Sequence, residues 1–413
     1  MARSPRGFGK TSTVVSLCAI VKNESHRIAD CLDSVRGFVD EAIVVDTGST
    51  DDTVMIAKQR GARVFQFDWC DDFATARNYS LQQASGDWIL VLDADEKLEP
   101  SAKIKLKQLV KQRDCLSANL LRQEIEAKQS PYSLVSRFFR RRADIYFSGY
   151  YHESIDDSIS KIRQQSPHWQ VYEVSGVSIQ HYGYQSSEID MKGKQNLAKR
   201  LMQKHLAEFP SDAYMHSKLG ALYVESGEPS RGLDLIQQGI AILNQSSDAN
   251  PHVQFELFYH AAIARSHQGE WQIAENCYQQ ALVLDVPDLV KLPALNNLGN
   301  LWQAQGKYEQ AIAAYQRVTQ IAPDFAKGFY NLGIALKSSG QLRSATSAYR
   351  QAIALDPEYA DAHQNLGVTL LKLGQMQEAI AAFVQAIALH ERQNNSNRAQ
   401  IIRDGMRDLG LKY

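Results

Sequence analysis

The sequence predicts an α/β domain with a doubly wound sheet, followed by an all-α solenoid. From Thr13 to Glu96, short apolar runs alternate with amphipathic segments, which is typical of a parallel sheet with helices on both faces. Later, Leu-Gly pairs that begin at Leu298, Leu332 and Leu366 recur every 34 residues, the period of a helix-turn-helix repeat. A chain of 413 residues is long enough for two or three domains.

The composition is that of a globular protein, with 44% hydrophobic and 22% charged residues. The formal net charge of −1 gives no electrostatic reason to expect a nucleic-acid partner. The five cysteines lack metal-site spacing and are typical of reduced thiols in a cytoplasmic protein. Because the apolar run Val14–Val21 is too short for a signal segment or a membrane span, we expect a cytoplasmic location and no span.

The expected elements follow from the positions of the apolar runs and the turn residues. Strands are predicted over Val14–Val21, Glu41–Val45, Arg63–Phe67 and Trp88–Leu92. Helices are predicted over Ser25–Val35, Asp51–Arg60, Asp72–Ala84 and Leu98–Val110. From Cys115 to Ile179 the pattern is irregular, with strands expected only near Leu134–Arg140 and Tyr172–Ile179.

The repeats are framed by glycines at the expected helix-helix turns, namely Gly227, Gly269, Gly306, Gly340 and Gly374. The domain limits expected from these patterns are a flexible N-terminus over 1–12, the α/β domain over 13–186 and a linking helix over 187–211. A solenoid of about five repeats follows over 212–392, and a tail with a capping helix over 393–413.

Polar residues leave the carboxyl ends of all four predicted strands. Ligands bind beyond these ends in such sheets, so the side chains should meet at one edge. In chain order they are Lys22, Asn23 and Glu24, then Asp46, then Asp71 and Asp72, and finally Asp93, Asp95 and Glu96. Asp93-Ala94-Asp95 directly follows a buried strand, where a carboxylate is costly unless it is paired or binds a metal. Such carboxylates commonly join Mg²⁺ or Mn²⁺ to substrate phosphates. Capping of the helix near Pro100 is the alternative, but Asp93 lies too far before it.

Taken together, these motifs resemble those of the family 2 glycosyltransferases, whose fold is the nucleotide-diphospho-sugar transferase fold GT-A. The matching stretches are SLCAIVKNE, AIVVDTGSTDDT, FATARN, DWILVLDADE, FSGYYHESI and IQHYGY, in this order between residues 13 and 185. With its tail, the whole chain is similar to bacterial glycosyltransferases that carry tetratricopeptide repeats. The resemblance implies an inverting transferase that uses a nucleotide diphosphate sugar, expected here to be a UDP-sugar.

The resemblance also implies roles for individual residues. Asp46 should bind the base, Asp93 the ribose or the metal, and Asp95 the metal, Mn²⁺ or Mg²⁺. His181 falls where the fold often supplies a further ligand, and its imidazole would favour Mn²⁺; a histidine satisfied within a tyrosine-rich junction is the alternative. The remaining nucleotide-sugar contacts are expected from Lys22, Asn23, Glu24, Arg77 and Asn78.

An inverting transfer requires a base opposite the leaving diphosphate. Glu153 is the expected base, with His152 orienting it or contacting the acceptor, although the pair could instead hold the acceptor loop in place. Asp71 and Asp72 are secondary candidates that helix capping explains nearly as well. The cluster of Arg137, Arg140, Arg141 and Arg142 could bind phosphate of an acceptor or form a solvated strand edge.

In the repeats, the residue before each Leu-Gly pair should face the concave groove. Asn297, Asn331 and Asn365 occupy this position in the last three units, where amides could bind a peptide backbone. A peptide or protein acceptor would follow, with homodimerisation through the repeats as the competing role. Two other readings stay open: a scaffold whose head binds nucleotide sugar without turnover, and a transferase acting on a lipid-linked or cell-envelope glycan.

Overall fold

The computed structural model describes residues 13–125, 132–183, 188–245 and 250–411. The chain divides into two compact units, residues 1–222 and residues 223–413, and the division falls within helix α7 (Ala213–Glu225). In the described part of the chain, no helix is long and apolar enough to cross a membrane.

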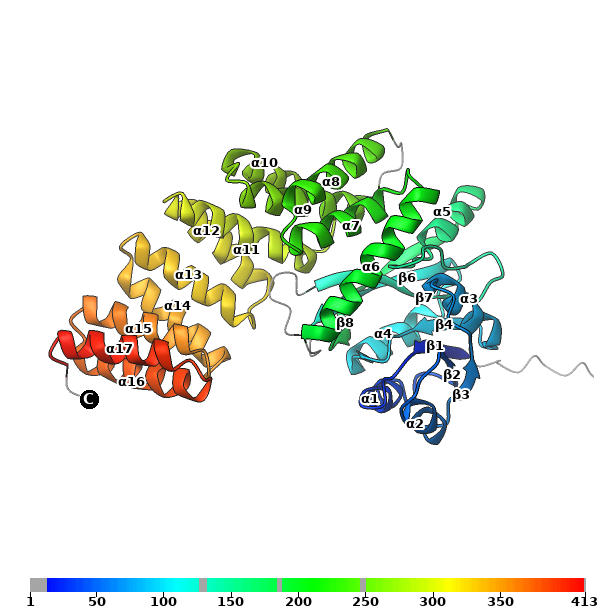
Figure 1. The fold of residues 1–413 in the computed structure, drawn as a ribbon, viewed down its shortest axis with the longest axis horizontal. Coiled ribbons are helices and arrows are strands. Elements are labelled where there is room, and N and C mark those ends of the chain that lie inside the picture. Colours follow the sequence, from blue (N-terminus) through cyan, green and yellow to red (C-terminus); the bar gives the residue numbers. More distant parts are fainter. Residues whose placement is uncertain (1–12, 126–131, 184–187, 246–249, 412–413) are drawn as a thin grey trace, which may run out of the picture. The chain divides into compact units, whose positions relative to one another are not determined.

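The first unit contains one sheet of eight strands, ordered β3-β2-β1-β4-β7-β6-β8-β5 (Figure 1). Its first half is parallel and confirms the four predicted strands: β1 (Val15–Val21), β2 (Glu41–Asp46), β3 (Arg63–Gln66) and β4 (Trp88–Val91). Its second half is mixed, because β7 (Tyr132–Arg140) runs antiparallel to both β4 and β6 (Cys115–Glu124). β8 (Gln170–His181) is parallel to β6 and antiparallel to β5 (Glu96–Leu98).

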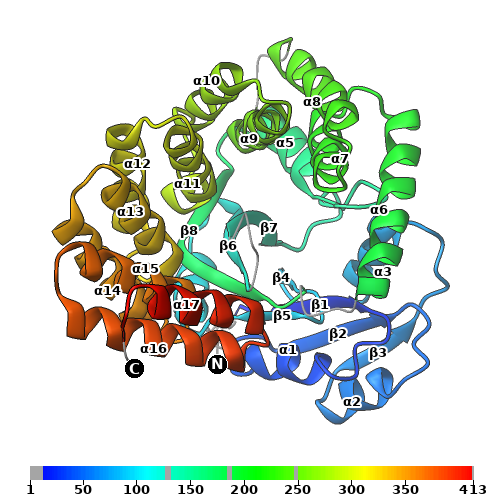
Figure 2. The same cartoon turned by 60° about the vertical axis from the view of Figure 1, so that its left-hand side comes forward.

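Alternate residues of the parallel strands enter two separate cores, as expected for a sheet buried on both faces. Leu17, Val44 and Leu90 belong to one core, which includes residues of α1 (Ile28–Ser34), α2 (Thr53–Gln59) and α4 (Pro100–Leu109). Cys18, Val45 and Val91 belong to the other, which includes residues of α3 (Phe73–Gln83) and α5 (Asp156–Gln165) (Figure 2). The predicted helices on both faces are thus confirmed.

The expectation of irregular structure from Cys115 onward was wrong in two places, β6 and α5, and the short strand β5 was also missed. β6 lies between β7 and β8, so polar residues in its sequence find partners there; the Asn119 side chain, for example, accepts a hydrogen bond from Ser136 Oγ at 2.9 Å. α5 was overlooked although Ile155, Ile159 and Ile162 recur at helical spacing, and all three are buried. The linking helix is present as α6 (Glu188–Glu208).

The second unit consists of helical pairs joined by the predicted glycine turns. All five glycines have φ between 73° and 82°, in the left-handed region that favours glycine. The helices that follow α7 are α8 (Pro229–Asn244), α9 (Pro251–His267), α10 (Trp271–Leu282), α11 (Asp288–Ala304), α12 (Tyr308–Ile321), α13 (Ala326–Ser338), α14 (Leu342–Leu355), α15 (Ala360–Lys372), α16 (Met376–Arg392) and α17 (Ser396–Asp408). α17 confirms the predicted terminal helix and buries Ala399, Ile402 and Met406.

The period of 34 residues has a packing cause. At Gly299, Gly333 and Gly367, an added Cβ would lie 2.7, 2.5 and 2.8 Å from an aromatic ring of the partner helix. The rings are those of Tyr315, Tyr349 and Phe383, and both tyrosines are fully buried. Each Leu-Gly pair therefore marks the point where the first helix of a repeat meets an aromatic side chain of the second.

Candidate active site

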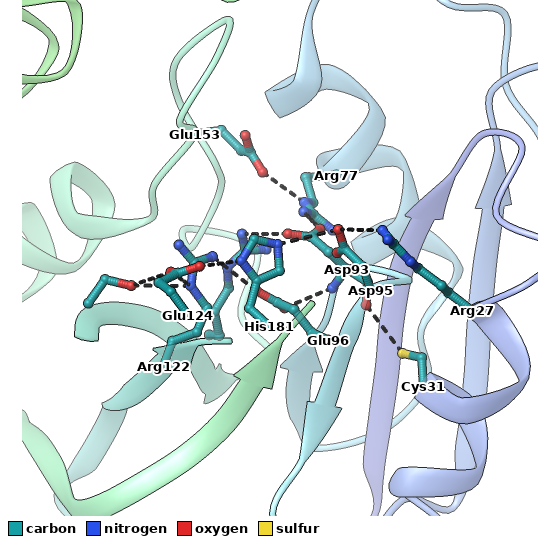
Figure 3. A network of polar contacts seen from close by, with 12 residues as sticks. Arg27, Cys31, Arg77, Asp93, Asp95, Glu96, Arg122, Glu124, Glu153 and His181 are labelled. Atoms are coloured by element: carbon teal, nitrogen blue, oxygen red, sulfur yellow. Dashed lines mark hydrogen bonds and ion pairs between the residues drawn. The ribbon is translucent and has the colours of Figure 1, made fainter. Parts of the chain in front are cut away.

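The carboxyl ends of the parallel strands meet at one edge, as expected. Val21 at the end of β1 lies opposite Asp46 at the end of β2, and β4 on the other side of β1 leads into Asp93. We call this edge, with the ends of β5, β6 and β8 and the loop that carries Glu153, the active-site edge. Figure 3 shows a network of polar contacts at this edge that includes Asp93, Asp95 and His181.

Asn23 joins the loops after β1 and β2, and Asp46 shapes the second of these loops. Asn23 has φ 56°, and its side-chain oxygen accepts a hydrogen bond from Thr50 N at 2.8 Å. Asp46 is buried, and its carboxylate accepts from the backbone N–H groups of Gly48 and Ser49 at 3.3 and 3.1 Å. Lys22 is exposed beside them. These three predicted nucleotide residues thus lie at the same corner of the edge.

Glu24 carries a buried acceptor atom that has no partner in the described part of the chain. Its Oε2 is enclosed and accepts no hydrogen bond from those residues. Burial, and then the nearby charge of Asp95, raise the pKa of this carboxyl. A carboxylate in this situation favours a donor group or a cation from outside the chain.

Arg77 connects the two carboxylates on which the predicted chemistry depends. This arginine on α3 is buried, ion-paired with Asp93 Oδ1 and bonded from Nε to Glu153 Oε1 at 2.9 Å (Figure 3). Arg137 Nη2 lies 3.3 Å from the other oxygen of Asp93. Although burial opposes it, the two guanidinium groups lower the pKa of Asp93, which stays ionised.

One nitrogen of each guanidinium group has no partner among the residues that the structure describes. Arg77 Nη1 and Arg137 Nη1 are both enclosed and donate no hydrogen bond, while only 3% and 11% of the two side chains is exposed. An unpaired buried donor of this kind costs free energy unless a ligand satisfies it. Two such donors on either side of Asp93 suit an anion.

Asp95 faces His181 across the edge. His181 Nε2 lies 3.3 Å from Asp95 Oδ2, and its Nδ1 bonds Glu124 on the neighbouring strand. Burial disfavours the imidazolium, but the bonds to Asp95 and Glu124 outweigh it and raise the pKa of His181 to about 10. Arg27 Nη1 approaches the same Asp95 oxygen at 3.6 Å.

Asp95 and His181 fit two ligands of one divalent cation. Adjacent ligands of an octahedral ion with bonds of about 2.1 Å lie about 3 Å apart, close to the 3.3 Å found here. Gly183 keeps the position open, since a Cβ there would lie 2.6 Å from His181 Nε2. Within the described ranges no three acidic, histidine or cysteine side chains form a metal-binding group. Asp93 could bind the same cation only if one of its oxygens first lost its arginine partner.

Asn78 lies next to Arg77 on α3 but turns to the loop that carries Glu153. Its side chain donates to Phe147 O at 2.9 Å and accepts from Phe147 N at 2.8 Å. His152, in the same loop, is exposed and has φ 54°. α3 therefore anchors this loop through Asn78, through the Arg77–Glu153 ion pair and through a bond from Phe73 N to Tyr150 O at 3.1 Å.

The secondary candidates have structural partners. Asp72 caps α3 through a bond from Thr75 N at 2.9 Å, and Asp71 pairs with Arg200 at 2.7 Å. The arginine cluster is divided, because only Arg137 reaches the active-site edge. Arg140 packs over Trp88, Arg141 bonds Gly86 O, and Arg142 pairs with Asp144.

The three asparagines of the predicted acceptor groove join neighbouring repeats. Asn297 donates to Tyr259 Oη at 3.3 Å, Asn331 to Asn296 Oδ1 at 2.8 Å, and Asn365 to Tyr330 Oη at 3.2 Å. Asn331 is buried, whereas Asn297 and Asn365 are partly exposed. Their binding of a peptide stays a prediction.

Sequence reasoning missed Arg122 and Glu124, which lie on the overlooked strand β6. Arg122 bonds Glu96 Oε1 at 3.0 Å and Glu124 Oε1 at 2.8 Å. Two charged residues at i and i+2 after the apolar run of this strand were the available signal, since such residues share one face. Arg27 and Gly183 were missed too, because only spatial proximity connects them to the site.

Comparison with known proteins gives matches to both halves of the chain. Residues 16–172 match the family described as glycosyl transferase family 2. Residues 299–340 match a TPR repeat, and residues 330–396 a tetratricopeptide repeat.

Among curated relatives, a TPR repeat-containing protein of Synechococcus elongatus is 40% identical over 316 residues, 76% of this chain and 77% of the relative. The glycosyltransferase SunS of Bacillus subtilis is 31% identical over 196 residues, 46% of this chain and 44% of SunS, so the match spans less than half of that enzyme. An uncharacterised glycosyltransferase of Rickettsia felis is 41% identical over 95 residues, 23% of this chain and 33% of the relative. Among solved structures, MamA from Desulfovibrio magneticus has a TM-score of 0.39 at 24% identity, over 44% of this chain and 96% of that one.

Proposed function

Because the chain belongs to the family 2 glycosyltransferases and carries tetratricopeptide repeats, we propose that it moves a sugar from a UDP-sugar to an acceptor with inversion. The observation that carries this proposal is the pair of unpartnered donors, Arg77 Nη1 and Arg137 Nη1, beside the Asp95–His181 pair. Guanidinium groups bind phosphate well, since their planar N–H groups match its oxygens.

In the proposed complex, the donor's nucleotide lies over the ends of β1 and β2. Asp46 would accept the imide N–H of uracil, while Lys22, Asn23 and Glu24 line the same corner. Arg77 and Arg137 would donate to the diphosphate from either side of Asp93. A divalent cation held by Asp95 and His181, Mn²⁺ or Mg²⁺, would neutralise charge on the diphosphate as it leaves.

Glu153 would act as the base. Arg77 holds its Oε1 at 2.9 Å, which leaves Oε2 to accept the proton from the nucleophile of the acceptor as that atom bonds the anomeric carbon. His152, exposed in the same loop, would contact the acceptor. Asn78 would support both residues by holding the loop at Phe147.

The acceptor is proposed to be a peptide, a protein or a glycan presented by the repeats, and a cytoplasmic location belongs to the same proposal. The partly exposed Asn297 supports a peptide, because its side chain retains hydrogen-bonding capacity beyond its bond to Tyr259. Asn365 could only accept, since its amide already donates to Tyr330 Oη and to Asp361 O. Its Oδ1 also accepts from Lys337 Nζ. Dimerisation through the same repeats would compete with acceptor binding.

The test is release of UDP from a panel of UDP-sugars, with Mn²⁺, with Mg²⁺ and with EDTA. We expect metal-dependent release from one donor, lost in Asp95→Ala. Asp144→Asn is the matched control, since it removes an exposed carboxylate whose ion-pair partner, in the described part of the chain, is Arg142. Tight UDP binding without release from any donor, with or without cell extract as a source of acceptor, would instead indicate a scaffold with an inactive head.

A further inference from the structure

Glu124 on β6 has no part in the proposed transfer, yet its carboxylate ends at the imidazole of His181. The two residues are direct partners in the β6–β8 register, and His181 Nδ1 bonds Glu124 Oε2. The other oxygen, Oε1, accepts from Arg122 Nε at 2.8 Å and from Ser133 Oγ at 3.0 Å. Both oxygens of the Glu124 carboxylate are therefore hydrogen-bonded. Because the side chain is also buried, its orientation is fixed.

The contact with Glu124 determines which ring nitrogen of His181 is available. A carboxylate at Nδ1 holds a proton on that nitrogen and turns the lone pair of the neutral ring to Nε2. Nε2 is the atom 3.3 Å from Asp95 Oδ2. The imidazole thus presents its only possible ligand atom to the carboxylate with which it would share a cation.

The same contacts close a ring around this position (Figure 3). Arg122 Nη1 bonds Glu96 Oε1 at 3.0 Å, and Glu96 Oε2 accepts from the backbone N–H of Asp93 at 2.9 Å. Asp93, Glu96, Arg122, Glu124, His181 and Asp95 are therefore one connected series. Such a series orients the imidazole and the loop after β4 relative to each other.

We propose that Glu124, supported by Arg122, is a positioning residue that holds His181 with Nε2 toward Asp95 and thereby makes the site selective for a cation that accepts nitrogen, Mn²⁺ over Mg²⁺. This inference rests on the proposed function, in which Asp95 and His181 hold the cation. It adds a residue on another strand and assigns the metal preference to it.

The experiment measures Mn²⁺ bound to the full chain with saturating UDP, from the electron paramagnetic resonance signal of free Mn²⁺, and Mg²⁺ by competition. In Glu124→Gln the Mn²⁺ affinity should fall about 10- to 100-fold. The Mg²⁺ affinity should fall less, because Mg²⁺ prefers oxygen ligands. If Glu124 acts through His181, the double variant Glu124→Gln/His181→Ala should bind Mn²⁺ no more weakly than His181→Ala alone, within about twofold.

Glu41→Gln is the matched control, since Glu41 is a mostly buried carboxylate bonded to an arginine and to serines at the opposite ends of the strands. It should leave Mn²⁺ affinity unchanged, and UDP binding in EDTA should show that every variant is folded. An unchanged Mn²⁺ affinity in Glu124→Gln would overturn the positioning role of Glu124 but not the proposed metal site. The same holds if the losses of Mn²⁺ affinity in the two single variants add up in the double variant. Wild type that binds UDP but no Mn²⁺ would overturn the proposed metal site together with it.

Discussion

Asn78 is bonded to Phe147 through both polar groups of its side chain, one donating to the backbone carbonyl and one accepting from the backbone N–H. The resemblance to the family implied that Asn78 contacts the nucleotide sugar. Its contacts instead make it a support for the loop that ends in Glu153.

Asn78→Asp should therefore lower turnover and stability while leaving UDP binding unchanged. The substitution places an acceptor against the carbonyl oxygen of Phe147, at a cost of about 1–3 kcal/mol. Denaturant unfolding and UDP titration measure the two effects, and Asn196→Asp, at an exposed position on α6, is the control. Loss of UDP affinity with unchanged stability would indicate that Asn78 contacts the nucleotide and does not support the loop.

Arg137→Gln should weaken UDP binding about tenfold or more. The variant removes a buried charged donor that we assign to the diphosphate, and a charged hydrogen bond contributes about 1.5–3 kcal/mol. Calorimetric titrations with UDP and with uridine distinguish a contact with the diphosphate from a contact with the nucleoside, because only the affinity for UDP should change. Arg142→Gln, which removes the half-buried partner of Asp144, should bind both ligands like wild type. Equal losses for uridine and UDP would contradict the assignment.

Gly333→Ala should destabilise the repeats, whereas Gly405→Ala should stabilise them. At Gly333 the new methyl group would lie 2.5 Å from the buried ring of Tyr349, and overpacking of this kind costs about 1–3 kcal/mol. Gly405 lies within α17 with nothing inside 4 Å, so alanine there should add about 0.5–1 kcal/mol. Hydrogen exchange of α13 and α17 in the full chain tests both changes; equal shifts in the two variants would refute the packing cause of the repeat.

Glu41 should make the first unit sensitive to acid. Burial opposes its ionisation, but hydrogen bonds from Ser16, Ser85 and Arg63 prevail and lower its pKa to about 2, against 4.5 for an ordinary glutamate. A depressed folded-state pKa stabilises the fold above pH 4.5, and this contribution is lost as the pH falls from there towards 2.

Glu41→Gln should thus be less stable at pH 7, by about 1–3 kcal/mol, and should lose less stability than wild type between pH 5 and pH 3. Unfolding followed across this range, with exchange of the β2 amides as a local probe, measures the difference. The control Asp68→Asn removes an exposed carboxylate of the same unit and should leave the profile unchanged. Parallel profiles for wild type and Glu41→Gln would disprove the assignment.

Local patterns predicted the parallel half of the sheet, its helices and the repeats, because each is encoded in neighbouring residues. β1, β2 and β4 consist mainly of apolar residues, and the turn glycines of the last three repeats recur every 34 residues. β6 was missed for the opposite reason: its polar residues are acceptable only because β7 and β8 flank it. A strand whose partners are distant in sequence leaves a weak signal in one dimension.

What the sequence by itself determined is the type of protein and the place of its chemistry: carboxylates after buried strands, at the edge where such sheets bind ligands, followed by a repeat tail. Only the tertiary structure decided which acidic side chains pair with which basic ones. Asp93 is bonded to Arg77 and Arg137, 16 and 44 residues away, and His181 to Glu124, 57 residues away. Charge pairing acts over a few ångströms and ignores sequence distance, so the fold alone selects which of many acidic and basic side chains meet.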